Sequence, residues 1–383
     1  MIDVRAHLAR KPLLFDGGMG TYYKAKPGTE CEQGNLLDPA GVRKVHREYL
    51  AAGAEAIKTN TFGLPRMAAA RQPDWQALAR AGWKLAAEAA VETGAAVFAD
   101  LGPAPDTEAA PAGSIYTAVA RCFVEQGAKN FLFETLSSDA GVLEAVQAVK
   151  AQVPDAFVLV SFAVLPDGYT REGMYSKDLV RRMTESGIVD AVGFNCVSAP
   201  GAMRTLVQQL GSTALPLSVM PNAGYPVVTR TQVKYQGKPE YFAKELARIA
   251  AEGVRILGGC CGTTPAHIAA LRAALDSLPA VKKAAPAVQV STPEAPTVEK
   301  DDAFLRKLNA GKKVIAIELD SPEDADLTNY LAGAKRLQAA GADLLTIADC
   351  PIARARMDSS LVACRVHREL GLCTLPHMTC RDR

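Results

Sequence analysis

The chain has 383 residues, of which 49% are hydrophobic and 22% are charged, so it is long enough for more than one domain and is not intrinsically disordered. The formal net charge of +2 gives no electrostatic basis for binding nucleic acid or a membrane surface, and we expect neither as a partner. No apolar run approaches the ~20 residues of a membrane-spanning helix, no signal-peptide segment opens the chain, and the nine cysteines show no framework spacing, which together predict a cytoplasmic protein with reduced thiols.

One pattern recurs along the first 260 residues: a helical stretch, a glycine, and then a short apolar run. It is typical of a helix that ends on a left-handed glycine and leads into a buried parallel strand. Eight apolar runs fit such strands, and they begin near Leu13, Ala56, Ala96, Phe131, Phe157, Ala191, Leu217 and Val254. Amphipathic stretches such as residues 75–91 and 241–251 lie between most of them. Eight alternating units predict an α/β fold of the (β/α)8 TIM-barrel type, with a doubly wound open sheet as the alternative.

Polar residues and cysteines close these predicted strands. The residues at these positions are Asp16, Asn60, Asp100, Glu134, Ser161, Asn195, Cys196, Asn222, Cys260 and Cys261. In a barrel, the carboxyl ends of all the strands form one catalytic face. We therefore expect acids, amides and thiols to gather in a ring at one end of the barrel.

Cys260 and Cys261 lie side by side in the glycine-rich turn GGCCGTTP, residues 258–265, and Cys196 follows another predicted strand. Neighbouring side chains of a strand point to opposite faces, so adjacent cysteines can serve one metal only where the chain bends, as glycines permit. Three thiolates are enough to hold a catalytic zinc ion with one coordination position open. The alternative is that all three are small buried hydrophobic residues, an interpretation that suits Cys196 better than the pair between glycines.

Residues 279–302 are rich in Ala, Pro, Val, Lys and Thr, and we expect them to link a first domain, residues 1–278, to a second, residues 303–383. The second domain is predicted to begin with a strand at 314–318, a helix from about 326 to 340, a strand at 344–347 and a helix near 359–370. Only three strand candidates fit before Arg383, and three parallel strands do not close a barrel. We therefore expect an incomplete second α/β barrel and a chain that is a fragment of a longer protein.

Six short motifs occur along the first domain. They are FDGGMGT (15–21), KTNTF (58–62), FET (133–135), GFNC (193–196), PNAG (221–224) and GGCCG (258–262). With these motifs in this order, residues 1 to about 278 resemble the homocysteine S-methyltransferase family. The resemblance implies a (β/α)8 barrel in which Cys196, Cys260 and Cys261 hold a zinc ion. It also implies an enzyme that transfers a methyl group to the thiolate of L-homocysteine and forms methionine.

The functional groups of homocysteine suggest which further residues bind it. Binding to zinc deprotonates a thiol and fixes its sulfur, so we expect homocysteine to take the open fourth position. Its ammonium needs a carboxylate, for which Glu134 is the first candidate and Asp16 the second, although Asp16 serves equally well as a turn residue. Its carboxylate needs backbone donors, which Gly17 and Gly18 are placed to offer. Asn195 is expected beside the substrate or as a loop cap.

Two motifs of the second domain, IELDSP (317–322) and PHMTCRDR (376–383), resemble the start of methylenetetrahydrofolate reductase, as found in bacterial fusions of the two enzymes. The resemblance implies flavin- and folate-side positions for Glu318 and His377. FAD is expected only if the reductase domain is complete, and we do not expect reductase activity from this chain alone.

The methyl donor and the rival functions are left open by the sequence. A fused reductase suggests a methyltetrahydrofolate-linked donor, directly or through a methylcorrinoid, while S-methylmethionine serves other family members. A homo-oligomer is compatible with the sequence. The alternative function is a non-catalytic barrel that acts as assembly partner of a folate reductase, which a fourth protein ligand at the zinc would favour. A third possible function is an aldolase-like barrel that uses Lys58. His267 lies in a predicted first helical turn, and we expect it to have a structural role.

Overall fold

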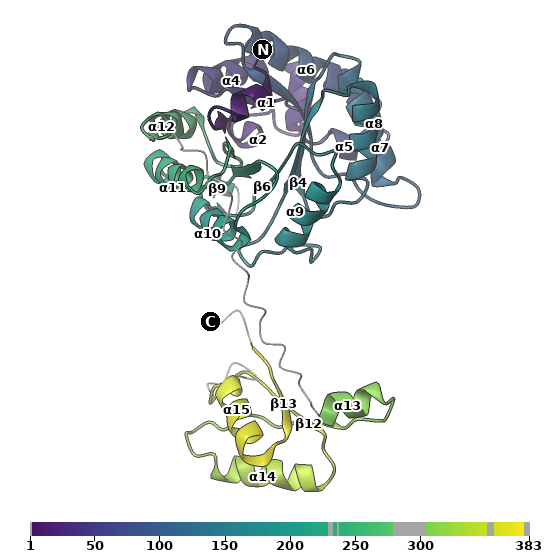
Figure 1. Ribbon diagram of the computed structural model, residues 1–383, viewed down its shortest axis with the longest axis vertical. Coiled ribbons are helices and arrows are strands. Elements are labelled where there is room, and N and C mark those ends of the chain that lie inside the picture. The colour runs from purple at the N-terminus through teal and green to yellow at the C-terminus, as the bar shows by residue number, and fades with distance from the viewer. Residues whose placement is uncertain (1, 229–232, 236, 279–302, 351–355, 379–383) are drawn as a thin grey trace. The chain divides into compact units, whose positions relative to one another are not determined.

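The computed structural model describes residues 2–228, 233–235, 237–278, 303–350 and 356–378. The chain divides into two compact units, Met1–Val288 and Gln289–Arg383 (Figure 1). The division falls inside the expected linker, residues 279–302, which lies outside the described residues. Residues 379–383 of the second C-terminal motif also lie outside them.

The first unit is a barrel of parallel strands. In chain order these are β1 (Leu13–Leu14), β2 (Ala56–Lys58), β3 (Ala96–Leu101), β4 (Asn130–Leu136), β5 (Phe157–Phe162), β6 (Ala191–Asn195), β7 (Leu217–Met220) and β10 (Ile256–Leu257). They form one eight-stranded sheet in the order β1-β10-β7-β6-β5-β4-β3-β2. A parallel bridge between Phe15 and Ala56 connects β1 to β2 and closes the circle. The predicted (β/α)8 barrel is therefore confirmed, with most strands beginning within one residue of the predicted starts.

The helices that follow the strands form the outer layer. They are α4 (Pro39–Ala51), α5 (Leu64–Ala69), α6 (Trp75–Val91), α7 (Ala112–Val124), α8 (Val142–Gln152), α9 (Ser176–Glu185), α10 (Pro200–Leu210), α11 (Pro239–Ala251) and α12 (Pro265–Asp276). Four glycines of the recurring pattern follow their helices with positive φ: Gly53, Gly127, Gly187 and Gly253. This is the left-handed helix ending that the pattern predicts.

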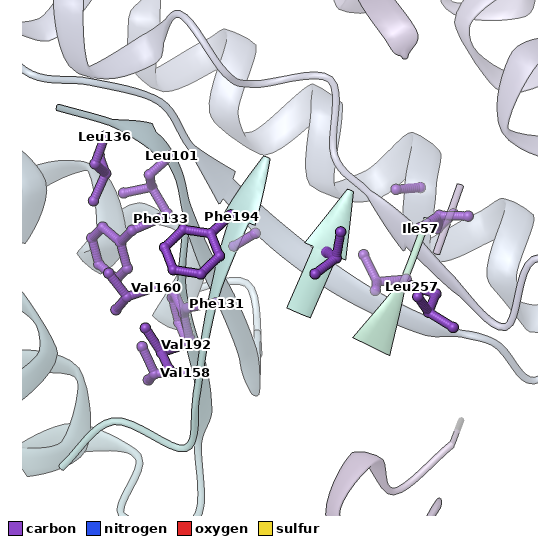
Figure 2. Packing of buried hydrophobic residues seen from close by; sticks show 14 of the residues in the cluster. Ile57, Leu101, Phe131, Phe133, Leu136, Val158, Val160, Val192, Phe194 and Leu257 are labelled. Carbon is purple, nitrogen blue, oxygen red and sulfur yellow. The ribbon is translucent and has the colours of Figure 1, made fainter. Parts of the chain in front are cut away.

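The strands are apolar along almost their whole length because both faces of the sheet are buried. Alternate residues point outward against the helices. Figure 2 shows Phe131 and Phe133 of β4, Val158 and Val160 of β5 and Phe194 of β6 gathered in this outer layer. The other set, which includes Phe98, Leu132 and Leu159, fills the barrel interior together with Val4 and Leu8 of α1 (Val4–Leu8). The residues that continue the inward-facing set at the carboxyl ends of β3 and β4, Asp100 and Glu134, are polar and buried.

Several short elements were not predicted from the sequence. They are α2 (Met19–Tyr22), the 3-10 turn η1 (Cys31–Gln33) and α3 (Gly34–Leu37) between β1 and α4, and the antiparallel hairpin of β8 (Pro226–Val228) and β9 (Val233–Tyr235) before α11. All of them follow barrel strands at their carboxyl ends. They therefore extend the face on which the strand-end polar residues lie.

The second unit has a three-stranded parallel sheet in the order β11 (Ala316–Glu318), β12 (Leu344–Ile347) and β13 (Cys373–Pro376). Its helices are α13 (Ala303–Asn309), α14 (Thr328–Ala339) and α15 (Ser359–Leu370). A separate core joins α14, α15 and the sheet through Tyr330, Leu345, Ile347, Val362 and Val366. None of the helices in the described parts of the chain has both the length and the apolar character needed to cross a bilayer.

Candidate metal centre and substrate site

Cys196, Cys260 and Cys261 converge at the carboxyl end of the barrel. Their sulfur atoms all lie within 4.8 Å of one another, and the sulfurs of Cys196 and Cys261 are 3.9 Å apart. Cys196 directly follows β6, and the other two follow β10, which is separated from β6 only by β7 in the sheet. Residues 65 positions apart in the sequence are thus brought together because neighbouring parallel strands end at the same edge.

Local backbone geometry turns these side chains toward one another. Cys196 and Val197 have φ of +57° and +30°, a left-handed region that residues with a side chain seldom adopt. β10 ends at Leu257, so Cys260 and Cys261 lie in a turn, where adjacent side chains are free to face the same way. The Thr263 hydroxyl fixes this turn by donating a 2.6 Å hydrogen bond to the carbonyl of Cys260. Backbone strain of this kind gathers at functional sites.

The three cysteines fit a tetrahedral zinc ion with one position left over. Zinc–sulfur bonds of about 2.3 Å place the sulfurs of a tetrahedral site about 3.8 Å apart, close to the spacing of Cys196 and Cys261. Among the His, Cys, Asp and Glu side chains of the described residues, only these three cysteines group closely enough at this site to share one metal ion. Three protein ligands are typical of a catalytic zinc site, whereas a structural one has four.

The thiols also share their protons. Hydrogen bonds from Cys196 and Cys260 lower the pKa of Cys261, while Cys260, which donates and is buried, has its pKa raised well above the usual value. The hydrogen bonds among the three thiols thus favour the ionised form of Cys261.

Glu134, at the end of β4, lies beside the cysteines and is fixed by Asn195. The Asn195 Nδ2 atom donates to Glu134 Oε2 at 3.3 Å and to Thr135 Oγ1 at 2.7 Å. Its Oδ1 accepts from the Thr135 backbone N–H at 2.9 Å and from the Ser161 hydroxyl at 2.8 Å. Asn195 thus joins β4, β5 and β6 across their carboxyl ends and orients the carboxylate of Glu134.

A second carboxyl group, Asp100 at the end of β3, hydrogen-bonds Glu134. Burial raises the pKa of Glu134 to about 7. Burial, reinforced by the charge of Glu134, raises the pKa of Asp100 well above its usual range. Burial and the repulsion between two neighbouring carboxylates therefore disfavour the state in which both groups are ionised. Asp100 was predicted at a strand end but was given no role.

Asp16 is engaged by Lys58 from the neighbouring strand. The Lys58 ammonium lies 2.9 Å from Asp16 Oδ1, and the Lys58 backbone N–H donates to Asp16 Oδ2 at 3.0 Å. Burial opposes the charge on Lys58, but the carboxylates of Asp16 and Glu134 outweigh it and raise the pKa of the ammonium. The pair is therefore ionised, and Lys58 serves as the partner of a buried acid.

The loop after β1 meets the cysteine turn through its glycines. The Gly18 N–H donates to the Thr263 hydroxyl at 3.0 Å. A Cβ atom on Gly18 would lie 2.6 Å from the Cys260 carbonyl, so this contact requires glycine. The Gly18 amide is thus already paired, and the predicted use of Gly17 and Gly18 as donors to a substrate carboxylate remains a prediction.

A cavity of about 620 Å³ opens over the cysteines, which is within the range of small-molecule sites. Its lining includes Gly18, Lys58, Asp100, Glu134, Thr135, Cys196, Cys260 and Cys261. Residues of the unpredicted elements α2 and η1, among them Met19 and Cys31, form another part of its wall. Asp16, Gly17 and Asn195 support these residues from behind and do not line the cavity.

Tyr235 at the end of β9 is a neighbour of the cysteines that sequence reasoning missed. The Tyr235 side chain lowers the pKa of Cys261, after the larger effects of Cys196 and Cys260. The approach is close because Gly262 has no side chain: a Cβ atom there would lie 2.2 Å from the Cβ of Tyr235. His267 has the structural role expected of it, since its Nδ1 accepts from the Thr264 N–H at 3.2 Å and its Nε2 lies 3.1 Å from the Gly237 carbonyl.

Glu318 and His377 both lie at the carboxyl edge of the second unit's sheet. Glu318 ends β11 and is exposed. His377 follows β13, is exposed, and is held by its backbone N–H, which donates to the Ile347 carbonyl at 2.8 Å. β12 separates the two strands, and the assigned cofactor-side positions remain a prediction.

The fold and site define a TIM barrel with a cluster of three cysteines and a buried carboxyl group at the carboxyl ends of its strands. The model of the family described as "Homocysteine S-methyltransferase" matches residues 13–275. The chain therefore belongs to the homocysteine S-methyltransferase family, which confirms the first of the two resemblances.

Individual relatives agree with this assignment. The chain is 32% identical over 307 residues to methionine synthase of Mycobacterium tuberculosis, covering 73% of this chain and 25% of the relative. It is 29% identical over 296 residues to homocysteine S-methyltransferase of Escherichia coli, covering 68% of this chain and 94% of the relative. The chain thus spans about a quarter of the length of the mycobacterial methionine synthases it matches.

Solved structures show the same likeness. The oxidized form of the E. coli homocysteine methyltransferase MmuM is similar with a TM-score of 0.57 at 25% identity, covering 71% of this chain and 99% of that one. The metallated form of MmuM also gives a TM-score of 0.57 at 25% identity, over 70% of this chain and 99% of that one.

Proposed function

We propose that this protein is a zinc-dependent methyltransferase that transfers a methyl group to the thiolate of L-homocysteine and forms methionine. The observation that carries the proposal is the convergence of three cysteine sulfurs over the barrel, next to a cavity with a buried carboxylate. Family membership and a similar structure described as metallated support it.

Cys196, Cys260 and Cys261 would hold the zinc ion. When bound, zinc lowers the pKa of a coordinating thiol so that a thiolate, the reactive form of the substrate, exists at neutral pH. The spacing of the sulfurs and the three-ligand set suit this role. A purely structural zinc would need a fourth protein ligand, and among the described residues no further His, Cys, Asp or Glu joins the three cysteines, which favours the catalytic function over the non-catalytic assembly partner.

The remaining site residues bind and orient the substrate in this proposal. Glu134 accepts the ammonium of homocysteine in its ionised form, because it lines the cavity beside the cysteines. Asn195 holds Glu134 in place through its 3.3 Å hydrogen bond. Asp16 acts indirectly through its ion pair with Lys58.

The proposed methyl donor is linked to methyltetrahydrofolate, either directly or through a methylcorrinoid. The support is the resemblance of the second unit to the start of methylenetetrahydrofolate reductase. In the second unit, Glu318 and His377 lie at one edge of the sheet. FAD enters the proposal only with a complete reductase domain. S-methylmethionine is the alternative methyl donor, and the test must compare it with the folate-linked donors. The proposal places the protein in the cytoplasm, with homocysteine and the donor as its small-molecule partners.

Metal analysis of cysteine variants tests the proposal. We expect about one zinc per chain, lost in Cys260→Ala and in Cys261→Ala because each removes one of three ligands. Cys31→Ala is the matched control, since Cys31 lines the same cavity outside the trio, and it should keep its zinc. Full zinc content in either of the first two variants would show that the metal site is assigned wrongly. Methionine formation with methyltetrahydrofolate, methylcobalamin and S-methylmethionine, each supplied separately, then identifies the donor.

A further inference from the structure

Asp100, at the carboxyl end of β3, is an acid to which the proposed function gives no role. Its side chain is 3% exposed and lines the cavity over the cysteines. Its Oδ1 atom is buried and has no hydrogen-bond partner among the described residues. A buried polar atom without a partner destabilises the free protein, and a ligand that supplies the missing partner recovers that free energy.

Two threonines of the KTNTF motif hold the backbone of Asp100. The Asp100 N–H donates to the Thr59 hydroxyl at 2.9 Å, and the Thr61 hydroxyl donates to the Asp100 carbonyl at 2.8 Å. The two hydroxyl oxygens are 2.6 Å apart, so Thr59 donates to Thr61 and closes a ring of three hydrogen bonds. The ring fixes the main chain of Asp100 and makes no contact with its carboxyl group.

The register of the barrel places Asp100 close to Glu134. Asp100 pairs with Leu132 across β3 and β4, and Glu134 lies two residues beyond Leu132, on the same inward-facing side of its strand. Phe98 and Leu132, two residues before these acids, belong to the interior core. Asp100 and Glu134 therefore end the inward-facing sets of neighbouring strands, and both line the cavity.

The nearby lysine is already engaged by a different acid. The Lys58 ammonium lies 2.9 Å from Asp16 Oδ1 and 3.4 Å from the Gly259 carbonyl. Among the ion pairs of the described residues, none joins Lys58 to Asp100 or to Glu134. This part of the cavity thus presents two acidic side chains without a cation paired to either.

We infer that the ammonium group of homocysteine binds between Glu134 and Asp100, which makes Asp100 a second substrate-binding residue. The inference rests on the proposed function. An ammonium group has three N–H donors, so it can donate to two carboxyl groups at once. Its positive charge also offsets the repulsion between the two acids. Asp100 then favours thiols that carry an amino group over thiols that lack one.

The test compares the binding of two thiols by isothermal titration calorimetry to the zinc-loaded full chain. One is homocysteine, and the other is 4-mercaptobutanoate, which has the same carboxylate and thiol but no amino group. Asp100→Asn keeps the shape of the side chain and removes its charge. We expect the Kd of homocysteine to rise about ten-fold, as for a lost hydrogen bond to a charged group, while the Kd of 4-mercaptobutanoate changes by less than about two-fold.

Glu30→Gln is the matched control, because Glu30 is an exposed acid that lines the same cavity, and it should change neither Kd. If Asp100→Asn does not fold, Asp100→Ser gives the same comparison. The comparison of two ligands on one variant also separates a lost contact from a general distortion of the cavity, since a distortion weakens both ligands.

Two outcomes would overturn the inference. Equal changes in the two Kd values, or no change in either, would show that Asp100 does not contact the ammonium. Weaker binding of 4-mercaptobutanoate, with unchanged binding of 3-aminopropane-1-thiol, which lacks the carboxylate, would assign Asp100 to the substrate carboxylate instead. If the unsubstituted zinc-loaded chain binds no homocysteine, the proposed function itself fails, and this result is distinct from the other two.

Discussion

Glu134 combines a buried position with a negative charge, and its surroundings explain how. The side chain is only 6% exposed, yet it accepts a hydrogen bond from Asn195 and lies near Asp100 and the ammonium of Lys58. Burial raises the pKa of this carboxyl group to about 7, and the charge of Lys58 and the hydrogen bond with Asp100 limit the rise. A carboxylate in this setting attracts an ammonium group strongly, because little water competes for either charge.

The pKa of Glu134 gives the site a predicted pH dependence. In the proposed role, only the ionised form of Glu134 binds the substrate ammonium, so the KM for homocysteine should fall as pH rises through about 7. Glu134→Gln should remove this dependence and raise the KM about 10- to 100-fold, since hydrogen bonds to charged groups contribute about 1.5–3 kcal/mol. Steady-state kinetics from pH 6 to 8.5 measure both effects. Glu30→Gln, an exposed acid on the same cavity, is the control. A KM that is unchanged in Glu134→Gln would exclude the assigned role.

For single residues, the sequence predicts the chemical role of a side chain more successfully than it predicts the contacts of that side chain. Glu134 stands out because an acid directly follows a wholly apolar run, where a surface role is implausible. The pairing of Asp16 with Lys58 was not predicted, because the two lie 42 residues apart and meet only when β1 and β2 are neighbours. Asp100 was placed at a strand end, but its raised pKa depends on burial that the sequence does not display.

Among the elements, α4 contains a buried histidine that should make the barrel sensitive to acid. His46 is 0% exposed, and neither ring nitrogen has a hydrogen-bond partner among the described residues. Burial lowers its pKa to about 4, from about 6.5 in an unfolded chain. Between these values the unfolded state binds the additional proton, so the free energy of unfolding rises with pH there. The stability is fully present above about pH 6.5 and is lost progressively as pH falls toward 4.

Replacing His46 tests this effect. The two pKa values correspond to about 3 kcal/mol of stability that disappears between pH 6.5 and 4. His46→Leu should remove that part of the pH dependence, because leucine has no proton to bind. Urea unfolding curves at several pH values in this window give the free energies. Equal pH dependence in the variant and the unsubstituted protein would contradict the prediction.

The helices and strands differ in how well they can be predicted from their sequences. The long helices and the eight strands were predictable, since apolar runs and terminal glycines mark each repeat. The β8–β9 hairpin was not, because its strands have only three residues each and no clear alternation. The short elements α2 and η1 are held by contacts with distant residues instead of a periodic pattern of their own. These elements, which the sequence did not predict, line the cavity or contribute Tyr235. Sequence patterns therefore locate the three cysteines better than they locate the residues around the substrate.

For the whole molecule, the two units have separate hydrophobic cores, and the metal centre belongs to the first. Both tryptophans of the chain, Trp75 and Trp83, lie in α6 of the barrel, so tryptophan fluorescence reports the unfolding of this unit alone (Figure 1). Zinc should raise the midpoint of the fluorescence transition by several degrees, since a ligand at 100 times its Kd stabilises by about 2.7 kcal/mol. Cys260→Ala should show no such shift. A zinc-dependent shift that persists in Cys260→Ala would place the metal elsewhere.

The central claim is that three cysteines bind one zinc ion and leave a position for the sulfur of homocysteine. X-ray absorption at the zinc edge of the loaded protein tests it most directly, because it counts sulfur neighbours. We predict three sulfurs at about 2.3 Å and one lighter neighbour without homocysteine, and four sulfurs once homocysteine is added. A sulfur count that stays the same when homocysteine is added, or fewer than three sulfurs at the start, would contradict the account.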